Sequence, residues 1–98
     1  MPTKQNKPKP LFALGATVST PGCLEAFQKN GTSGIEYLAR HLTGDWGDVC
    51  EEDKNVNDDA VKEGDRILSA YTLKDGTKFW IITERDRSVT TFLLPSEY

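Results

Sequence analysis

The chain has 98 residues and a net charge of −3, with 37% hydrophobic and 28% charged residues. This length accommodates one domain, and the composition is that of an ordinary globular protein. No stretch approaches the roughly 20 consecutive apolar residues that a membrane span requires. No apolar run of signal-peptide length follows the basic start. We therefore expect a cytoplasmic protein without membrane contact.

The charge is unevenly distributed along the chain. The first ten residues carry three lysines and no acid, so the other 88 residues sum to −6, and residues 45–65 alone hold nine acids against two lysines. Nucleic-acid-binding proteins usually present a basic surface to the phosphates. Nucleic acid is therefore not the expected partner, and a protein partner or a second copy of the chain fits better. The simpler alternative is that the acidic block is a solvated helix face.

Residues 1–10 are rich in proline and lysine and predict a disordered basic tail, which leaves 11–98 as a single α+β domain. Leu11–Thr20 contains enough β-forming residues for a short strand. Thr20-Pro21 then predicts a helix start, with threonine as the N-cap and proline in the first turn. Asn30-Gly31 predicts the end of that helix.

Two further helices are predicted before the last third of the chain. Ser33 and Glu36 have the spacing of a capping box, and the apolar residues that follow recur at helical intervals up to a stop at Gly44. Asp48 is the predicted cap of the third helix, which ends at Gly64. Its polar residues far outnumber its apolar ones, so this helix is expected to rest lightly on the core.

The last third is typical of strands, which are expected over Arg66–Leu73, Lys78–Glu84 and Val89–Leu94. Asp75-Gly76 predicts a two-residue hairpin turn that pairs Tyr71 with Trp80. A turn over 85–88 pairs Trp80 with Leu93. The fold class is thus α+β, with two or three helices packed on a three-stranded antiparallel meander and with an N-terminal strand as a possible addition.

Because strand side chains alternate, this register sorts them onto two faces. The expected core face holds Leu68, Ala70, Phe79, Ile81, Phe92 and Leu94. The other face is also apolar at its centre, and it holds Tyr71, Trp80, Ile82, Thr91 and Leu93. Leu11–Thr20 or the acidic helix is one possible cover for this second face, and another protein is the alternative. Tyr71, Trp80, Ile82 and Leu93 are accordingly candidate binding residues.

Few residues suggest catalysis. His41, the only histidine, is a candidate general base, although a histidine near a helix end also favours the helix dipole. Glu84 and Arg87 lie in a polar hairpin and are candidates for a base and for an anion-stabilising group, with a surface turn as the alternative. Cys23 and Cys50 are expected to be free thiols. No motif indicates a metal or a cofactor, so none is expected.

Several segments resemble a group of short bacterial proteins found on plasmids, integrated elements and gene cassettes. The resemblance runs from about Leu14 to Tyr98 and rests on the segments 20–22, 38–41, 44–48, 68–71, 80–88 and 93–98. Its most specific part is Asp45-Trp46-Gly47-Asp48, and no functional residue is carried over from it. Asp45, Trp46 and Asp48 are also candidate binding residues. The resemblance implies a mobile-element setting and transfers no activity.

The order of elements is also similar to that of RelE-type and barnase-like small ribonucleases, although the acidic body of this chain departs from their pattern. The leading expectation is a non-enzymatic accessory protein that binds a partner or itself through the aromatic sheet face or the acidic helix. The alternative is a small ribonuclease that uses the hairpin from Glu84 to Thr91.

Overall fold

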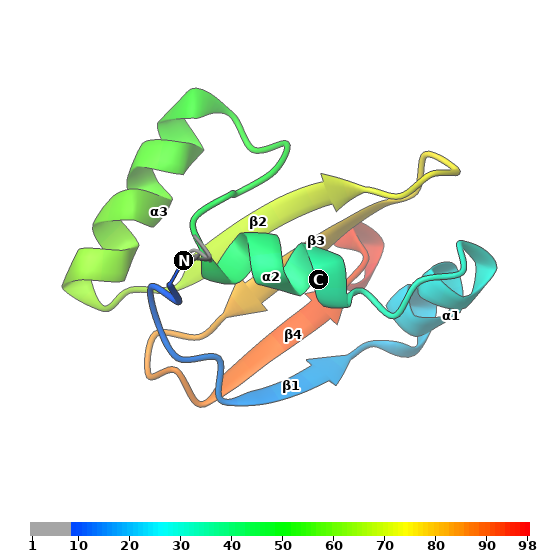
Figure 1. The fold of residues 1–98 in the computed structure, drawn as a ribbon, viewed down its shortest axis with the longest axis horizontal. Coiled ribbons are helices and arrows are strands. Elements are labelled where there is room, and N and C mark those ends of the chain that lie inside the picture. Colours follow the sequence, from blue (N-terminus) through cyan, green and yellow to red (C-terminus); the bar gives the residue numbers. More distant parts are fainter. Residues whose placement is uncertain (1–8) are drawn as a thin grey trace, which may run out of the picture.

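A computed structural model describes residues 9–98 as three helices arranged over and beside one β-sheet (Figure 1). The first eight residues of the predicted tail lie outside the described part. The α+β class is confirmed. In chain order the elements are β1 (Ala16–Ser19), α1 (Pro21–Lys29), α2 (Ile35–Leu42), α3 (Glu51–Glu63), β2 (Ile67–Thr72), β3 (Lys78–Thr83), β4 (Val89–Leu93) and the short 3-10 helix η1 (Pro95–Glu97).

The sheet has four strands in the order β1-β4-β3-β2. β2, β3 and β4 form the antiparallel meander that the sequence predicts. The N-terminal strand that the sequence suggests as a possible addition is present as β1, and because β1 pairs with β4 in parallel, the sheet is four-stranded and mixed. The Ala16 N–H donates to the Ser88 carbonyl at 3.0 Å, and the Thr20 N–H donates to the Phe92 carbonyl at 2.9 Å. These bonds fix the strand from Leu11–Thr20 at one edge of the sheet.

The first helix begins and ends as its sequence signals predict. The Thr20 hydroxyl accepts from the backbone N–H of Cys23, Pro21 occupies the first turn, and Asn30 is the C-cap. One side of α1 is buried against the sheet, where Phe27 makes edge-to-face contacts with Phe79 and Phe92. Aromatic pairs of this geometry add to the stability gained from burying their surface.

The other two helices depart from the predicted capping. Ser33 does not cap α2, because Gly34 is the N-cap residue and the Thr32 hydroxyl donates to Glu36 instead. Likewise Cys50, not Asp48, is the N-cap residue of α3, which ends at Gly64 as predicted. Among the residues that the structure describes, no helix combines the length and the apolar composition that crossing a membrane requires.

The predicted register of β2 is wrong by one residue. Thr72 pairs with Lys78 and Tyr71 pairs with Phe79, so three residues rather than two form the tip of the hairpin. The Gly76 N–H donates to the Leu73 carbonyl, and Gly76 has a φ of +92°. This is a type I turn followed by a left-handed residue, the usual solution for a three-residue hairpin loop. The predicted register between β3 and β4 is confirmed.

The one-residue shift moves the side chains of β2 to the opposite faces. Tyr71 therefore lies in the core beneath α1 and α2, whereas Leu68 and Ala70 lie on the far face of the sheet. We call the face under the helices the helix face, and its central residues are Ile67, Ser69, Tyr71, Phe79, Ile81, Thr83, Thr90 and Phe92. We call the opposite side the second face, and its central residues are Leu68, Ala70, Trp80, Ile82, Thr91 and Leu93.

Candidate functional site

The second face is apolar at its centre and only partly covered. Trp80 and Leu68 are half-buried, whereas Ile82 and Leu93 are buried. The C-terminal turn reaches this face, since Tyr98 packs edge-on against Trp80 at 5.6 Å between ring centroids. The Arg66 guanidinium lies over the Tyr98 ring and donates to its hydroxyl. The sequence suggested Leu11–Thr20 or the acidic helix as a cover for this face, but the contacts with Trp80 come from Tyr98 at the C-terminal turn.

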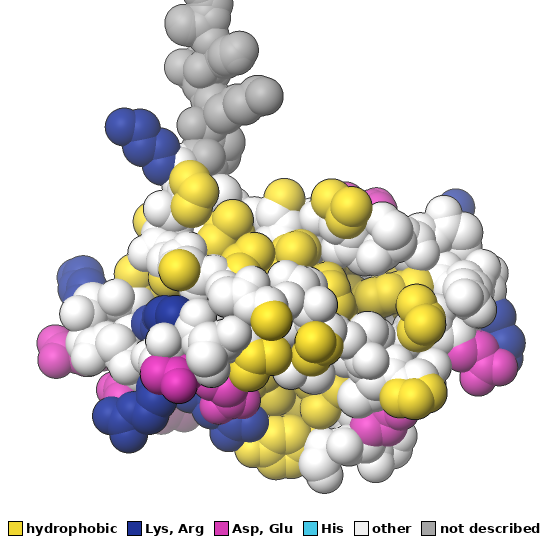
Figure 2. Space-filling view, turned by 90° about the horizontal axis from the view of Figure 1, so that it is seen from below, with side chains coloured by type: hydrophobic (Ala, Val, Ile, Leu, Met, Phe, Trp, Pro, Cys, Tyr) yellow, Lys and Arg dark blue, Asp and Glu magenta, His cyan; other side chains and the backbone are white. Residues whose placement is uncertain are grey.

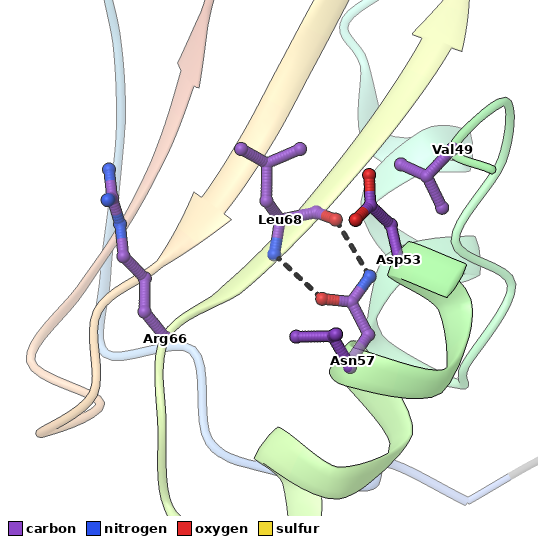
Figure 3. A pocket seen from close by; sticks show the side chains of 6 residues that line it. Val49, Asp53, Asn57, Arg66 and Leu68 are labelled. Carbon is purple, nitrogen blue, oxygen red and sulfur yellow. Dashed lines mark hydrogen bonds between the residues drawn. The ribbon is translucent and has the colours of Figure 1, made fainter. Parts of the chain in front are cut away.

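A groove of about 200 Å³ lies where α3 meets β2, and we call it the α3–β2 groove (Figure 3). Val56 of α3 lies in its lining and is 57% exposed. Asp53 and Arg66 bring opposite charges to the lining. The groove is lined by Val49, Asp53, Val56, Asn57, Arg66 and Leu68.

Asn57 fixes α3 to the edge of β2. Its side-chain amide donates to the Leu68 carbonyl at 2.8 Å, and its carbonyl oxygen accepts from the Leu68 N–H at 3.2 Å (Figure 3). Trp46 holds the same helix from the other side through a 3.0 Å bond from its indole N–H to Asp58. α3 carries six acids against Lys54 and Lys62, so a negative helix stands beside the groove.

His41 lies in the interior rather than at the surface. Its side chain is fully buried, with Nδ1 2.5 Å from the Ser69 hydroxyl and Nε2 2.9 Å from the Thr83 hydroxyl. Burial lowers the pKa of His41 to about 3, and the nearby positive charge of Arg87 adds to this effect. His41 is therefore neutral at pH 7.

The hydrogen-bond chain around His41 has one direction. The Thr90 hydroxyl donates to the Leu14 carbonyl, so its oxygen accepts from the Thr83 hydroxyl 2.8 Å away. Because Thr83 donates to Thr90, its oxygen must accept from Nε2–H of His41. Nδ1 is then unprotonated and accepts from Ser69. Both ring nitrogens are thus used inside the fold, and neither faces solvent.

Arg87 binds backbone carbonyls. Its guanidinium donates to the carbonyl oxygens of Asp65 at 2.6 Å, Ala60 at 3.1 Å and Glu84 at 3.2 Å. Ala60 belongs to the last turn of α3, and its carbonyl also accepts from the backbone N–H groups of Gly64 and Asp65. Arg87 therefore acts as a cap that joins the end of α3 to the β3–β4 hairpin.

The three catalytic candidates do not come together. His41 contacts the helix face of the sheet. Thr83 belongs to that face, and because side chains alternate along a strand, the next residue, Glu84, points to the opposite side. Glu84 lies 3.7 Å from Arg66 in a pair in which both side chains are 42% exposed. A base and an anion-binding group that serve one reaction must converge on one substrate position. The polar hairpin lacks that convergence.

Two of the aromatic binding candidates are buried. Tyr71 is 1% exposed and donates its hydroxyl to the Asp45 carbonyl at 2.6 Å, while burial raises its pKa to about 12. Trp46 is 3% exposed and stacks with Phe12. These two rings organise the interior around the segment from Asp45 to Asp48 and offer no surface to a partner.

The two acidic candidates are exposed and hold that same segment in place. Asp45 pairs with Arg40 at 2.8 Å, and this contact lowers the pKa of the Asp45 carboxyl. The Asp48 carboxylate accepts from the Thr72 hydroxyl at 2.7 Å. The segment also bonds to β2 through its backbone, as Asp48 N–H donates to the Ala70 carbonyl and Ala70 N–H to the Trp46 carbonyl.

Sequence reasoning missed Asn57 and the hydroxyls that bind His41. Asn57 was expected to be one of many polar residues on a solvated helix, and only its spacing of three from Ala60 places it on the buried side. Ser69, Thr83 and Thr90 share the helix face only in the correct register. Cys23 and Cys50 are free thiols, as predicted, and burial raises the pKa of Cys23 to about 12.

Comparison with protein-family models, with curated proteins and with solved structures finds no match for this chain. In the part of the chain from residue 9 onward, no group of three His, Cys, Asp or Glu side chains lies close enough together to hold a metal ion. The contacts described above are therefore the basis for a functional proposal.

Proposed function

We propose that this chain is a non-enzymatic binding protein of a mobile element, and that it holds a basic segment of a protein partner against the α3–β2 groove and the adjoining second face. The observation that carries the proposal is the groove itself. Val56 is 57% exposed beside half-buried Leu68, in a groove of about 200 Å³. That volume is suited to an apolar anchor side chain of a partner.

Charge decides the kind of partner. The helix that forms one wall carries six acids and two lysines, and Asp53 lies in the groove lining. The positive charge of Arg66 on the other wall is offset by Glu84 3.7 Å away. A segment with lysines or arginines beside an apolar anchor matches these walls, because opposite potentials speed the encounter and like charges oppose it.

An NMR titration with two designed peptides tests the proposal. One 14-residue amphipathic peptide carries leucine and lysine, and the other has glutamate at every lysine position. We expect the lysine peptide to shift the amide signals of Val49–Asn57 and Arg66–Leu68, with weaker binding as salt rises. The glutamate peptide is expected to leave these signals in place. Equal binding of both peptides, or no shift at these residues, would contradict the proposal.

A matched pair of variants locates the contact. Val56→Arg places a positive charge in the groove, whereas Ile35→Arg changes an apolar residue on α2 that is somewhat more exposed, at 67%. We expect Val56→Arg to weaken binding of the lysine peptide at least about tenfold and Ile35→Arg to leave it unchanged. The same loss in both variants would mean that the peptide binds by charge alone.

The ribonuclease alternative makes a different prediction. It requires RNA cleavage that is lost in Glu84→Gln, a variant that leaves the carbonyl contacts of Arg87 intact. The binding proposal expects no cleavage by either protein. Cleavage by the wild type and its loss in Glu84→Gln would favour the enzyme and displace the binding proposal.

A further inference from the structure

The two edges of the sheet differ. At the β2 edge, Ala70 bonds to the backbone of Trp46 and Asp48, and Leu68 bonds to the side chain of Asn57. Such covering is how proteins keep a sheet edge from pairing with other chains. At the other edge lies β1, the lowest strand in Figure 1, with no helix outside it. All four of its residues are exposed.

Among the residues that the structure describes, none pairs with the outer side of the β1 backbone. Ala16 and Thr20 bond to β4 through their N–H groups, as given above. Backbone groups alternate in direction along a strand, so the N–H and C=O groups of Thr17 and Ser19 point away from β4. Two donors and two acceptors therefore stand in a row at the margin of the sheet.

Hydrophobic side chains surround this row. Figure 2 views the molecule from the β1 side and shows hydrophobic side chains gathered on that surface. Val18 lies between the two outward residues and is 46% exposed, and Leu24 on the following helix is 50% exposed. β1 itself, Ala-Thr-Val-Ser, carries no charge. An uncharged strand meets no repulsion from an identical strand.

We propose that β1 is a self-association edge, at which two copies of this chain pair antiparallel about a two-fold axis through Val18. In this arrangement Thr17 of each copy lies opposite Ser19 of the other. Each such pair exchanges two N–H···O bonds, which gives four bonds in all, and the two Val18 side chains lie next to each other at the centre. The partner is a second copy because the outward N–H and C=O groups of Thr17 and Ser19 are complementary to the same groups of an identical strand turned by the two-fold axis.

The difference between the edges also sets the size of the assembly. Pairing through β1 uses the open edge of each copy, and the covered β2 edges then terminate the joined eight-stranded sheet. Association through one self-complementary patch closes as a dimer and does not propagate. This surface is separate from the α3–β2 groove, so the dimer stands or falls independently of the proposed peptide binding.

Thr17→Pro tests the pairing without removing a bond within the chain, because the Thr17 N–H points outward. We expect light scattering over a concentration series to show that the wild type becomes a dimer by about 1 mM protein. Two of the four bonds are lost in Thr17→Pro, which is expected to raise the dimer dissociation constant roughly 10- to 100-fold. Thr17→Ala keeps the N–H and is the matched control, expected to dimerise as the wild type does.

A charge exchange at Val18 provides a test that does not depend on proline. Val18→Lys and Val18→Glu each place like charges together at the axis, so each alone is expected to be monomeric. Their equimolar mixture is expected to form the mixed dimer. A wild type that stays monomeric at 1 mM, or a dimer insensitive to Thr17→Pro and to both Val18 variants, would overturn the proposal. A dimer restored only in the mixture would establish that Val18 faces its own copy.

Discussion

At the scale of single residues, His41 shows how a titratable group can serve as a neutral core residue. Its two ring nitrogens bind Ser69 and Thr83, and Phe12 and Trp46 pack edge-on against the ring. A charged imidazolium would lose its hydration and would add a proton to Nδ1, where Ser69 now donates. The His41 side chain therefore serves to fill the interior and to make two hydrogen bonds, and it does not transfer protons near pH 7.

This state predicts a loss of stability in mild acid. The pKa of His41 is about 3 in the folded protein and about 6.5 in the unfolded chain, so only the unfolded state takes up the proton between these values. The stabilisation is complete above pH 6.5 and declines as the pH falls toward 3. We expect the free energy of unfolding to be about 2 kcal/mol lower at pH 5 than at pH 7 from this residue alone.

Urea unfolding at pH 7, 6 and 5 measures the effect. His41→Gln keeps polar atoms at the position and cannot titrate, so its stability is expected to vary far less over this range. Asp45 and the other carboxyls with lowered pKa values release their contribution only at lower pH, outside the window. Parallel pH profiles for the wild type and His41→Gln would show that another group is responsible.

At the scale of elements, Arg87 joins the end of α3 to the β3–β4 hairpin. Its guanidinium provides donors to three carbonyls, and hydrogen bonds that involve a charged group are stronger than neutral ones. We expect Arg87→Ala to lower the free energy of unfolding by about 2 kcal/mol. Arg87→Lys retains the charge but not the planar arrangement of donors, so much of this loss is expected to remain.

The neighbouring Arg85 is the control for this prediction. Arg85 pairs with Asp65 at 3.5 Å, but the two side chains are 77% and 61% exposed. An exposed ion pair contributes little, so Arg85→Ala is expected to cost about 0.5 kcal/mol or less. Denaturant unfolding compares the three variants. Equal losses in Arg87→Ala and Arg85→Ala would mean that the carbonyl contacts add nothing beyond surface charge.

Elements were also the level at which the sequence was most informative. Thr20 and Gly64 marked helix ends correctly, and the β3–β4 register followed from alternation. Ser33 and Asp48 carry the same kind of local signal but do not cap their helices, so local sequence located the helices better than it assigned their caps. The register of β2 depended on whether two or three residues form the turn at Gly76. The Asp75-Gly76 pair is compatible with both loop lengths, so the sequence did not determine the register. That single residue moved Tyr71 from the expected binding face into the core. The α3–β2 groove could not be predicted, since it depends on how α3 docks.

At the scale of the whole molecule, the contrast between the two sheet edges limits the size of the assembly. Gly47 helps to cover the β2 edge, because its segment forms an isolated parallel bridge to Ala70. Gly47 has a φ of +76°, and a Cβ there would overlap the Ala70 carbonyl oxygen. Gly47→Ala must therefore displace the segment and leave the Ala70 N–H and C=O unpaired at an opened edge.

We expect Gly47→Ala to lower the free energy of unfolding by about 3 kcal/mol and, under conditions where it remains folded, to associate beyond a dimer. Gly64→Ala is the matched control. Gly64 has a similar φ of +80° but open space around it, so its variant is expected to cost about 1 kcal/mol without further association. Light scattering across a concentration series distinguishes the two.

If edge pairing drives the growth, adding Thr17→Pro to Gly47→Ala closes one of the two open edges and stops it at a dimer. Growth that continues in the double variant would show that the displaced core, and not the opened edge, is responsible.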